Sequence, residues 1–347
     1  MLALALLFSI HITPQATDIP LRQPQLATDG RMIALTYGAG NTVYFAKSDD
    51  GGITFSKAVV VSDMGKLSLG MHRGPRVAIT QNGIVISAVV GEKGKGADGD
   101  VVAWRSTDGG RTWSPPVRVS DAPTAAREGL HSMAFGGKDT VFATWLDLRN
   151  NGTQLYGSVS RDGGMSWSPN TLVYQSPSGS VCQCCHPSAI VDAPGRITVM
   201  FRNAVNGARD LYVIHSVDGG STFGKAEKLG RGTWEINACP MDGGGIAMTK
   251  SAGLVSVWRR QKEIYLAALS GDEKLLGAGK DPVIAQGKDG IYAAWTSPDG
   301  IRVKVPGKAD PFILDPAGSS VQLIGSPKGS VLAAWENNGS LVIQGIP

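Results

Sequence analysis

Four copies of one short motif constrain the fold of this chain more than any other feature of its sequence. Each copy follows the pattern Ser-x-Asp-Gly-Gly-x-Ser/Thr-aromatic, and the copies occupy residues 48–55, 106–113, 160–167 and 216–223. Their central aspartates are 58, 54 and 56 residues apart. A period of this size predicts a repeat architecture, in which each unit is one small structural element packed against its neighbours.

The motif itself has a mechanical interpretation. An aspartate can accept hydrogen bonds from nearby backbone N–H groups in a tight turn, and the two glycines allow positive φ there. The aromatic residue can bury its ring between neighbouring sheets. We therefore expect each copy to stabilise a hairpin turn and to carry no chemistry of its own.

The pattern resembles the Asp box, or BNR repeat, of the sialidase-like superfamily. At the level of repeats the resemblance covers nearly the whole chain, and it implies an all-β β-propeller of four-stranded antiparallel blades with a ligand site on the axis. In sialidases that site holds a sialic-acid carboxylate with three arginines. A tyrosine activated by a glutamate is the nucleophile there, and an aspartate is the general acid.

Composition and apolar segments give the expected number of blades. The 347 residues include 46 glycines and only 18% charged residues, which suits many short strands joined by tight turns. Seven apolar segments, several ending in Trp, are interpreted as the second strand of successive blades: 32–37, 84–90, 141–145, 197–201, 254–258, 291–295 and 331–335. Seven blades are thus favoured over the six of sialidases. The last unit, Ser320 to Ile346, offers three strands and would take its fourth from the mature N-terminus, which would close the ring.

The first sixteen residues are typical of a secretory signal. An apolar run from Leu2 to Ile10 precedes small and polar residues up to Ala16, although a positively charged start is missing. The alternative is a first buried strand. A signal implies export to the periplasm or the outside, with residues 17–347 as a single propeller domain. No later apolar stretch is long enough to span a bilayer, and a net charge of +4 from scattered Lys and Arg does not indicate nucleic-acid binding.

Three histidines occupy equivalent positions in consecutive repeats. His72, His131 and His186 each stand where the first strand of a blade begins. In a propeller these entrances and the loops between the second and third strands lie around the axis on the face opposite the Asp boxes, so the three imidazoles are expected at one axial mouth. The alternative is three separate hydrogen-bonded histidines near a polar channel.

All four cysteines fall in the same region. Cys182, Cys184 and Cys185 precede the fourth blade, and Cys239 stands at the equivalent entrance of the fifth. In an exported protein, Cys182 or Cys184 could form a disulfide with Cys239. The thiols and the three histidines would also suit copper, and residues 182–186 formally satisfy the Cys-x-x-Cys-His pattern of covalent haem attachment. The sequence leaves these three interpretations open.

Arginines and carboxylates are also expected on the axial face. Arg149, Arg202 and Arg259 follow second strands, Arg22, Arg73 and Glu128 precede first strands, and Glu235 precedes Cys239. Guanidinium groups suit a carboxylate ligand, although some of them could instead form salt bridges between loops.

The catalytic residues of sialidases carry over only in part. Arg22 is a shifted match to the first family arginine, Arg202 and Arg259 match the others by position, and no tyrosine stands at an axial entrance. Glu128 and Glu235 are the best catalytic candidates. The hypotheses are an exo-sialidase-type glycoside hydrolase that acts on or binds acidic glycans, a periplasmic copper or haem propeller, and a non-catalytic propeller that binds a glycan or a protein.

Overall fold

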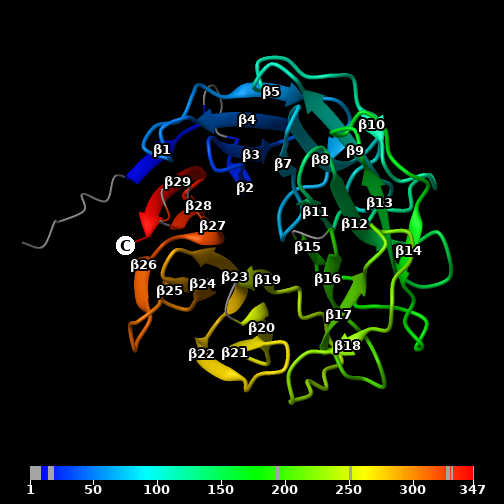
Figure 1. The fold of residues 1–347 in the computed structure, drawn as a ribbon, viewed down its shortest axis with the longest axis vertical. Helices are drawn as coiled ribbons and strands as arrows, with labels where there is room; N and C mark the ends of the chain where they lie inside the picture. Colours follow the sequence, from blue (N-terminus) through cyan, green and yellow to red (C-terminus); the bar gives the residue numbers. More distant parts are fainter. Residues whose placement is uncertain are drawn as a thin grey trace, which may run out of the picture.

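The fold is a ring of seven antiparallel sheets around a central axis (Figure 1). The computed structural model describes residues 9–14, 19–192, 195–249, 252–325, 329 and 331–346. All secondary-structure elements assigned within these residues are strands. The prediction of an all-β propeller with seven blades is therefore confirmed. None of the described segments is a helix that could cross a membrane.

The blades are numbered here in chain order, and each runs from the axis outward. Blade 1 consists of β2 (Leu21–Thr28), β3 (Ile33–Ala39), β4 (Thr42–Ser48) and β5 (Val59–Ser62). Blade 2 consists of β6 (Lys66–Leu67), β7 (Arg76–Thr80), β8 (Gly83–Gly91), β9 (Asp100–Ser106) and β10 (Val117–Arg118). Blade 3 consists of β11 (His131–Phe135), β12 (Val141–Asp147), β13 (Gln154–Ser160) and β14 (Thr171–Tyr174). Blade 2 has an extra short strand, because β6 and β7 both pair with β8.

The remaining four blades repeat the same order. Blade 4 consists of β15 (Ser188–Val191), β16 (Ile197–Arg202), β17 (Leu211–Ser216) and β18 (Glu227–Lys228), and blade 5 of β19 (Gly245–Thr249), β20 (Gly253–Arg260), β21 (Glu263–Ala268) and β22 (Lys274–Ala278). Blade 6 consists of β23 (Lys280–Gly287), β24 (Gly290–Ser297), β25 (Gly300–Lys304) and β26 (Phe312–Asp315). Blade 7 consists of β27 (Ser319–Gly325), β28 (Val331–Asn337) and β29 (Ser340–Ile346), together with β1 (Ser9–Ile12). All seven predicted second strands are therefore present.

The ring is closed by strands from the two ends of the chain. β1 pairs antiparallel with β29, with Ser9 opposite Gln344 and Ile12 opposite Leu341, and the two lie side by side in Figure 1. An N-terminal closing strand was expected, but it comes from Ser9–Ile12, inside the segment interpreted as a secretory signal. The other residues of that segment, except 13 and 14, lie outside the described part of the chain. The signal remains a prediction.

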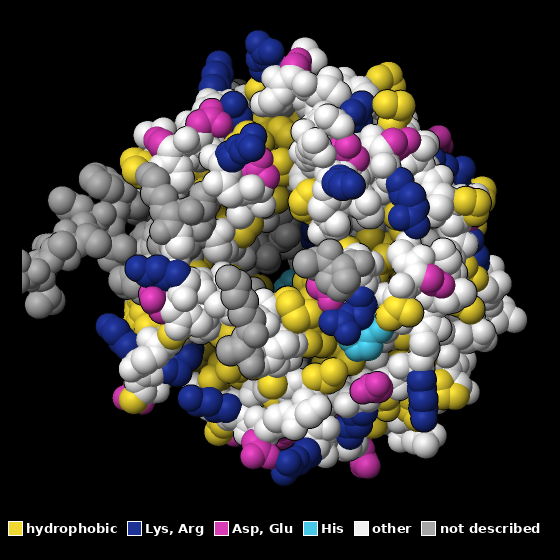
Figure 2. Space-filling view, viewed as in Figure 1, with side chains coloured by type: hydrophobic (Ala, Val, Ile, Leu, Met, Phe, Trp, Pro, Cys, Tyr) yellow, Lys and Arg dark blue, Asp and Glu magenta, His cyan; other side chains and the backbone are white. Residues whose placement is uncertain are grey.

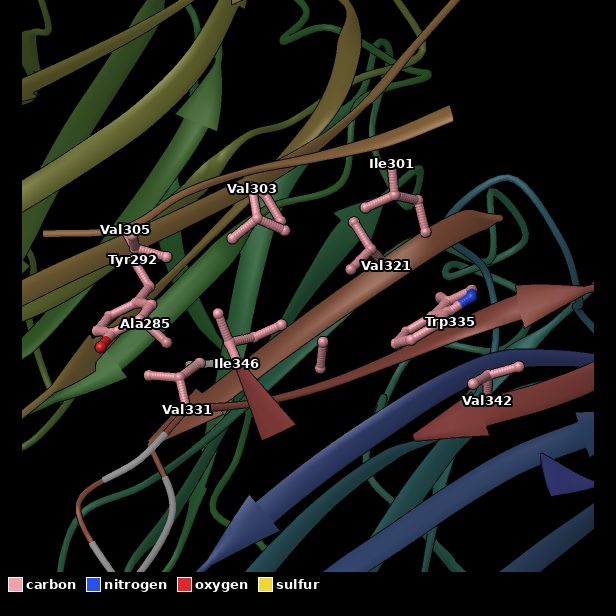
Figure 3. Packing of buried hydrophobic residues seen from close by; sticks show 12 residues of the cluster. Ala285, Tyr292, Ile301, Val303, Val305, Val321, Val331, Trp335, Val342 and Ile346 are labelled. Carbon is pink, nitrogen blue, oxygen red and sulfur yellow. The ribbon is translucent and has the colours of Figure 1, made fainter. Parts of the chain in front are cut away.

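The core is divided among the contacts between neighbouring blades. Seven apolar clusters of buried residues each join two adjacent blades. Figure 3 shows the one between blades 6 and 7, where Trp335 and Val342 of one blade face Ile301 and Val303 of the other. Because second strands such as β12 are buried on both faces, they are mostly apolar rather than alternating.

The four Asp boxes form the turns between third and fourth strands. In the second box, Asp108 Oδ1 accepts hydrogen bonds from the N–H groups of Arg111 and Thr112, both at 3.0 Å, and from the Ser106 hydroxyl at 2.8 Å. The other three boxes have the same turn. Hydrogen bonds from Thr112 hold the pKa of Asp108 well below its usual range. The mechanical interpretation of the motif is confirmed.

The second glycine and the aromatic residue of each box fix neighbouring blades together. Gly110 has φ of +87°, and a Cβ there would lie 2.0 Å from the Phe45 ring of blade 1. Trp113 packs edge-on against the same ring, with centroids 5.3 Å apart. The box therefore joins its own turn to the preceding blade.

Candidate functional site

A cavity lies on the axis, where the first strands of the seven blades meet. It has a volume of about 210 Å³ and is bounded by residues from every blade. Its polar wall consists of Gln23, Gln25, His72, Arg76, Ser132, His186, Ser188 and Gln322. We call it the axial cavity. On the face shown in Figure 2 the ring surrounds a central hollow, and cationic and anionic side chains are interspersed around it.

Several blade entrances have a left-handed backbone at a residue that is not glycine. Gln23, His72, Met241, Asp281 and Ser320 have φ between 50° and 70°. Near three of them, in β2, β23 and β27, the register shifts by a bulge. Such conformations cost free energy for residues with a Cβ and are concentrated at functional sites. The bulges turn successive side chains at the entrances in new directions.

An ion pair crosses the cavity entrance between blades 2 and 6. His72 Nε2 lies 2.9 Å from Asp281 Oδ1, and the Asp281 N–H donates to Asp242 Oδ2 at 2.9 Å. Burial acts to raise the pKa of Asp281, but the hydrogen bond and charge of His72 outweigh it and lower the pKa. Asp242 is fully buried, which raises its pKa.

The histidines are brought together only in part. His72 stacks on His186, with ring centroids 4.3 Å apart, and both line the axial cavity. His131 instead lies between blades 2 and 3, fully buried, with Nε2 at 3.0 Å from the Ser87 hydroxyl. Burial, together with nearby cationic groups, lowers the pKa of both His131 and His186 well below 6.5.

A buried guanidinium forms part of the cavity wall. Arg76 donates hydrogen bonds to the backbone carbonyls of His72, Gly74 and Pro75, at 2.6 to 3.1 Å. No described carboxylate forms an ion pair with it. Burial lowers the pKa of Arg76 to about 10, so the group still carries its charge at neutral pH. The wall thus presents a cation that the described residues leave without a counter-anion.

Three of the four thiols form a compact cluster beside the axis. Cys182 Sγ lies 3.0 Å from Cys185 Sγ and 3.6 Å from Cys184 Sγ. The sulfurs of Cys184 and Cys185 are 4.0 Å apart. All four cysteines are free thiols in this structure. Hydrogen bonds from Cys184 and Cys185 lower the pKa of Cys182, whereas burial raises that of Cys185. Cys184 raises the pKa of the adjacent Cys239 to about 11.

Arg202 and Arg259 lie close together, as their positions predict, but their guanidinium groups donate hydrogen bonds to backbone carbonyls. Arg202 is buried and donates to the carbonyls of Asp242, Arg209 and Arg259. Arg259 donates to the carbonyls of Gln261 and Pro240. Both guanidinium groups lie over the ring of Trp234, at 5.2 and 5.3 Å. They therefore fix the contact between blades 4 and 5.

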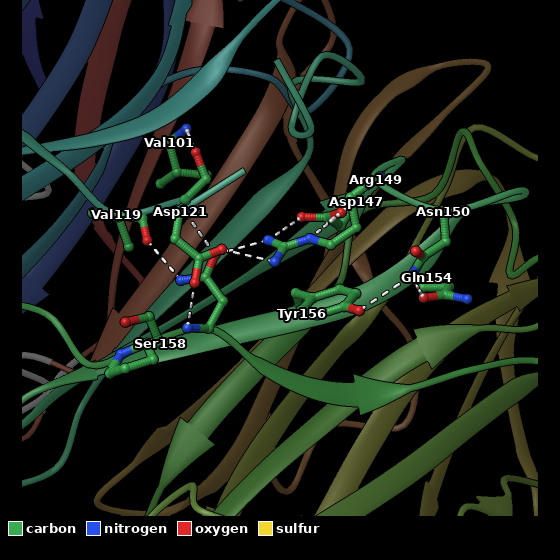
Figure 4. Close-up of polar contacts among 12 residues, drawn as sticks. Val101, Val119, Asp121, Asp147, Arg149, Asn150, Gln154, Tyr156 and Ser158 are labelled. Carbon is green, nitrogen blue, oxygen red and sulfur yellow. Dashed lines mark hydrogen bonds and ion pairs between the residues drawn. The ribbon is translucent and has the colours of Figure 1, made fainter. Parts of the chain in front are cut away.

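Two other predicted arginines are engaged in salt bridges. Arg149 lies between Asp147 and Asp121, at 2.9 and 2.7 Å, and covers the Tyr156 ring (Figure 4). Arg22 is half exposed and pairs with Glu336 of blade 7 at 3.2 Å. Neither lines the axial cavity. The alternative that some arginines tie loops together thus describes these two residues.

Arg73 and Glu128 share a second pocket, outside the axial cavity. This outer pocket has a volume of about 570 Å³, and its charged residues are Arg73, Lys95, Arg127 and Glu128. Arg73 Nε donates to the Glu128 carbonyl at 2.6 Å. Burial raises the pKa of the Glu128 carboxyl, although Arg73 and Arg127 oppose the shift. Glu235 is exposed and lines neither pocket.

A comparison with protein-family models shows which family these repeats belong to. Residues 43–248, more than half of the chain, match the model described as a BNR repeat-like domain. The chain belongs to the BNR repeat-like family. A comparison with curated protein sequences gave no match.

Solved structures similar to this BNR propeller carry several activities. A GH93 α-L-arabinofuranosidase of Fusarium graminearum with arabinobiose is 12% identical, with a TM-score of 0.59 and 98% of both chains covered. A Hadza microbial sialidase is 14% identical, with a TM-score of 0.53 over 94% of this chain and 65% of that one. A virginiamycin B lyase from Staphylococcus aureus is 12% identical, with a TM-score of 0.56 over 98% and 99%. At these identities the likeness concerns the fold alone.

Some residues of the site were missing from the sequence-based set. Asp281, Asp242 and the glutamines of the cavity wall lie in blades 1, 5, 6 and 7, and three of these blades have no Asp box to mark the register. One sequence signal could have pointed to Asp281. It precedes a proline at the start of β23, as Gln23 precedes a proline in β2, and both residues have a left-handed backbone.

Proposed function

We propose that this BNR propeller binds a carboxylated sugar or an acidic glycan end in its axial cavity. The observation that supports this most directly is Arg76, a buried cation on the cavity wall with no anionic partner among the described residues. A charge removed from water is costly unless it is paired, and a planar guanidinium suits a carboxylate. A carboxylate ligand would supply the missing charge.

The rest of the wall suits the polar part of such a ligand. The side chains of Gln25 and Gln322 line the cavity without a hydrogen bond to any other described residue. Each amide offers both donors and an acceptor, which is what sugar hydroxyls require. His72 is held by Asp281, so its ring is already positioned before a ligand enters.

Calorimetric titration of the wild-type protein tests this binding. Galacturonic acid and N-acetylneuraminic acid should bind, and galactose, which lacks the carboxylate, should bind at least about tenfold more weakly, as expected for loss of a charge-assisted hydrogen bond. Absence of binding by every acidic sugar at millimolar concentration would contradict the proposal.

Variants of Arg76 locate the site. Arg76→Lys keeps the charge but loses the fork of donors, so it should weaken binding of acidic sugars while galactose is unaffected. Arg302 is a matched control, because it lies on the surface and pairs with Asp299. Arg302→Lys should bind as the wild type does. Equal binding by both variants would place the ligand elsewhere.

Hydrolysis is a second candidate function, supported by the outer pocket. Glu128 is a carboxylic acid with a raised pKa beside three cationic residues, as a general acid acting on an acidic glycoside requires. The lining of this pocket contains one carboxyl group, so it offers an acid but not a second carboxylate. If a fluorogenic sialoside or uronide is turned over, Glu128→Gln should abolish the reaction and Glu92→Gln, a nearby exposed control, should not. Absence of turnover would leave a binding protein.

We also infer export, from the apolar run Leu2–Ile10. N-terminal sequencing of the protein purified from its own cells tests this inference. Cleavage near Ala16 would confirm it and would remove β1 from blade 7. An intact N-terminus would mean that the apolar run serves as the closing strand instead.

A further inference from the structure

The loop between β14 and β15 carries a feature that the proposed glycan site does not use. Its three thiols lie within 4.0 Å of one another, and each could direct one sulfur to a shared point. We propose that Cys182, Cys184 and Cys185 form a binding site for one thiophilic d¹⁰ metal ion, Cu(I) or Zn(II). This site is separate from the axial cavity and does not depend on the proposed function.

The backbone holds the cluster in place before any ion arrives. The Cys182 N–H donates to the Arg202 carbonyl at 3.0 Å, and the Val181 N–H donates to the Thr153 carbonyl at 2.9 Å. Cys182 and Cys185 are 2% and 1% exposed, while Cys184 is half-buried. The loop is therefore anchored to blades 3 and 4, and Cys184 provides the side from which an ion can enter.

The distances between sulfurs suit a common ion. A metal–sulfur bond of about 2.3 Å places sulfurs about 3.8 Å apart in a tetrahedral site and about 4.0 Å apart in a trigonal one. Two of the three pairs, at 3.6 and 4.0 Å, are already close to these values. Only Cys182 and Cys185, at 3.0 Å, need to move apart, by about 0.8 to 1 Å.

A neighbouring cation and the sulfur ligands favour a soft ion. The guanidinium of Arg202 acts electrostatically on both Cys182 and Cys185, so a buried cation balances part of the negative charge. Sulfur ligands select Cu(I) and Zn(II) over hard cations. Cys182 and Cys185, the two thiols of the formal haem-attachment pattern, are close enough to ligate one metal ion together. Their proximity favours a single ion over two separate covalent bonds to a haem.

Cys239 distinguishes the two ions. It stands at the entrance of blade 5, is exposed, and lies outside the group of three thiols whose sulfurs are within 4.8 Å of one another. With Cys239 as fourth ligand the site is tetrahedral, as structural zinc requires. Without it the three remaining thiolates form a trigonal site of the kind that suits Cu(I).

The experiment measures metal binding by the full chain, reduced and freed of metal under argon. The chain, with four titratable thiols, is titrated with Cu(I) against a chromophoric copper chelator and, separately, with Zn(II) against a zinc chelator. One equivalent of Cu(I) or Zn(II) per chain, bound tightly enough to be taken from the chelator, is expected. Cys239→Ser should leave Cu(I) binding within about threefold and weaken Zn(II) binding by at least about tenfold, because a structural zinc site needs four ligands.

A matched set of variants keeps the result interpretable. Cys184→Ser changes a half-buried thiol and should lose the ion while the circular dichroism spectrum stays that of the wild type. Ser180→Ala, in the same loop, should retain it. The proposal is overturned if the reduced wild type takes neither ion from its chelator, or if Cys184→Ser folds normally and binds both ions as tightly as the wild type.

Discussion

The two ends of the propeller are made from the same repeats but use them in opposite ways. At the Asp-box end, four blades have the same turn with the same hydrogen bonds, and glycines supply its left-handed positions. At the axial end, left-handed positions are taken by residues such as Gln23, His72 and Asp281. The blades meet a common structural requirement at one end and contribute different side chains at the other.

This contrast separates folding from binding. Each Asp box depends on hydrogen bonds within its own turn and on the packing of its glycine and aromatic residue against the preceding blade. The same eight-residue motif can therefore serve in every blade that has a box. The axial end instead collects buried charges. Arg202 and Asp242 are hydrogen-bonded across blades, whereas Arg76 is bonded only to backbone carbonyls of its own blade. A change at the axial end should therefore reach further than its own blade.

The largest effect is expected at Arg202. Arg202→Met removes the guanidinium donor from one buried and two partly buried hydrogen bonds to carbonyls, and it should lower the free energy of unfolding by about 3 to 5 kcal/mol. Urea denaturation measures it. Arg302→Met, which loses a surface pair with Asp299, should stay within about 0.5 kcal/mol of the wild type. Equal losses in the two variants would show that Arg202 does not join the blades.

A pair of glycines tests the Asp-box end. Gly110→Ala brings a Cβ to 2.0 Å from the Phe45 ring at φ of +87° and should cost about 3 kcal/mol, from overpacking and backbone strain together. Gly137→Ala has nearly the same φ, +83°, with no atom within 4 Å of the new Cβ. It should cost only about 1 kcal/mol. A thermal denaturation difference smaller than 1 °C between them would refute close packing of the box.

The smallest effect concerns pH. The unfolded chain protonates a histidine near pH 6.5, whereas burial keeps His131 neutral in the folded state to a much lower pH. The unfolded state therefore binds the proton first, and stability falls as the pH drops below 6.5, by up to about 1.4 kcal/mol per pH unit. The box aspartates have lowered pKa values, so they remain ionised through this range.

His131→Gln isolates that contribution. Urea denaturation of both proteins between pH 7 and pH 5 should give a shallower pH dependence for the variant, because one of the protons taken up on unfolding is removed. His131 faces Ser87 and the charge of Arg76, and the variant keeps a hydrogen-bonding side chain there. Parallel curves would mean that His131 titrates alike in both states.

The sequence was informative where the structure is repetitive. The box spacing and the Trp-ended apolar runs predict seven blades, because both patterns follow from local turn chemistry and from burial on both faces of a strand. The clustering of Cys182, Cys184 and Cys185, and the approach of His72 to His186, follow from their common place at blade entrances.

The charges of the site were less predictable. Whether Arg149 or Arg76 faces a ligand depends on which carboxylates lie nearby, and those partners, such as Asp121 for Arg149, come from distant parts of the chain. Asp281 reaches His72 across 209 residues. No local pattern encodes such a pairing, since it arises only when the ring has closed.

The pairing of β1 with β29 also has a consequence for the order of synthesis. In a chain from which the predicted signal is not cleaved, β1 is synthesised long before its partner β29 and must wait for that strand before it can pair. Six blades can assemble while translation continues, whereas the seventh can only be completed afterwards. A nascent chain stalled before residue 340 should therefore remain open to proteases at both ends, and release of the finished chain should protect both together.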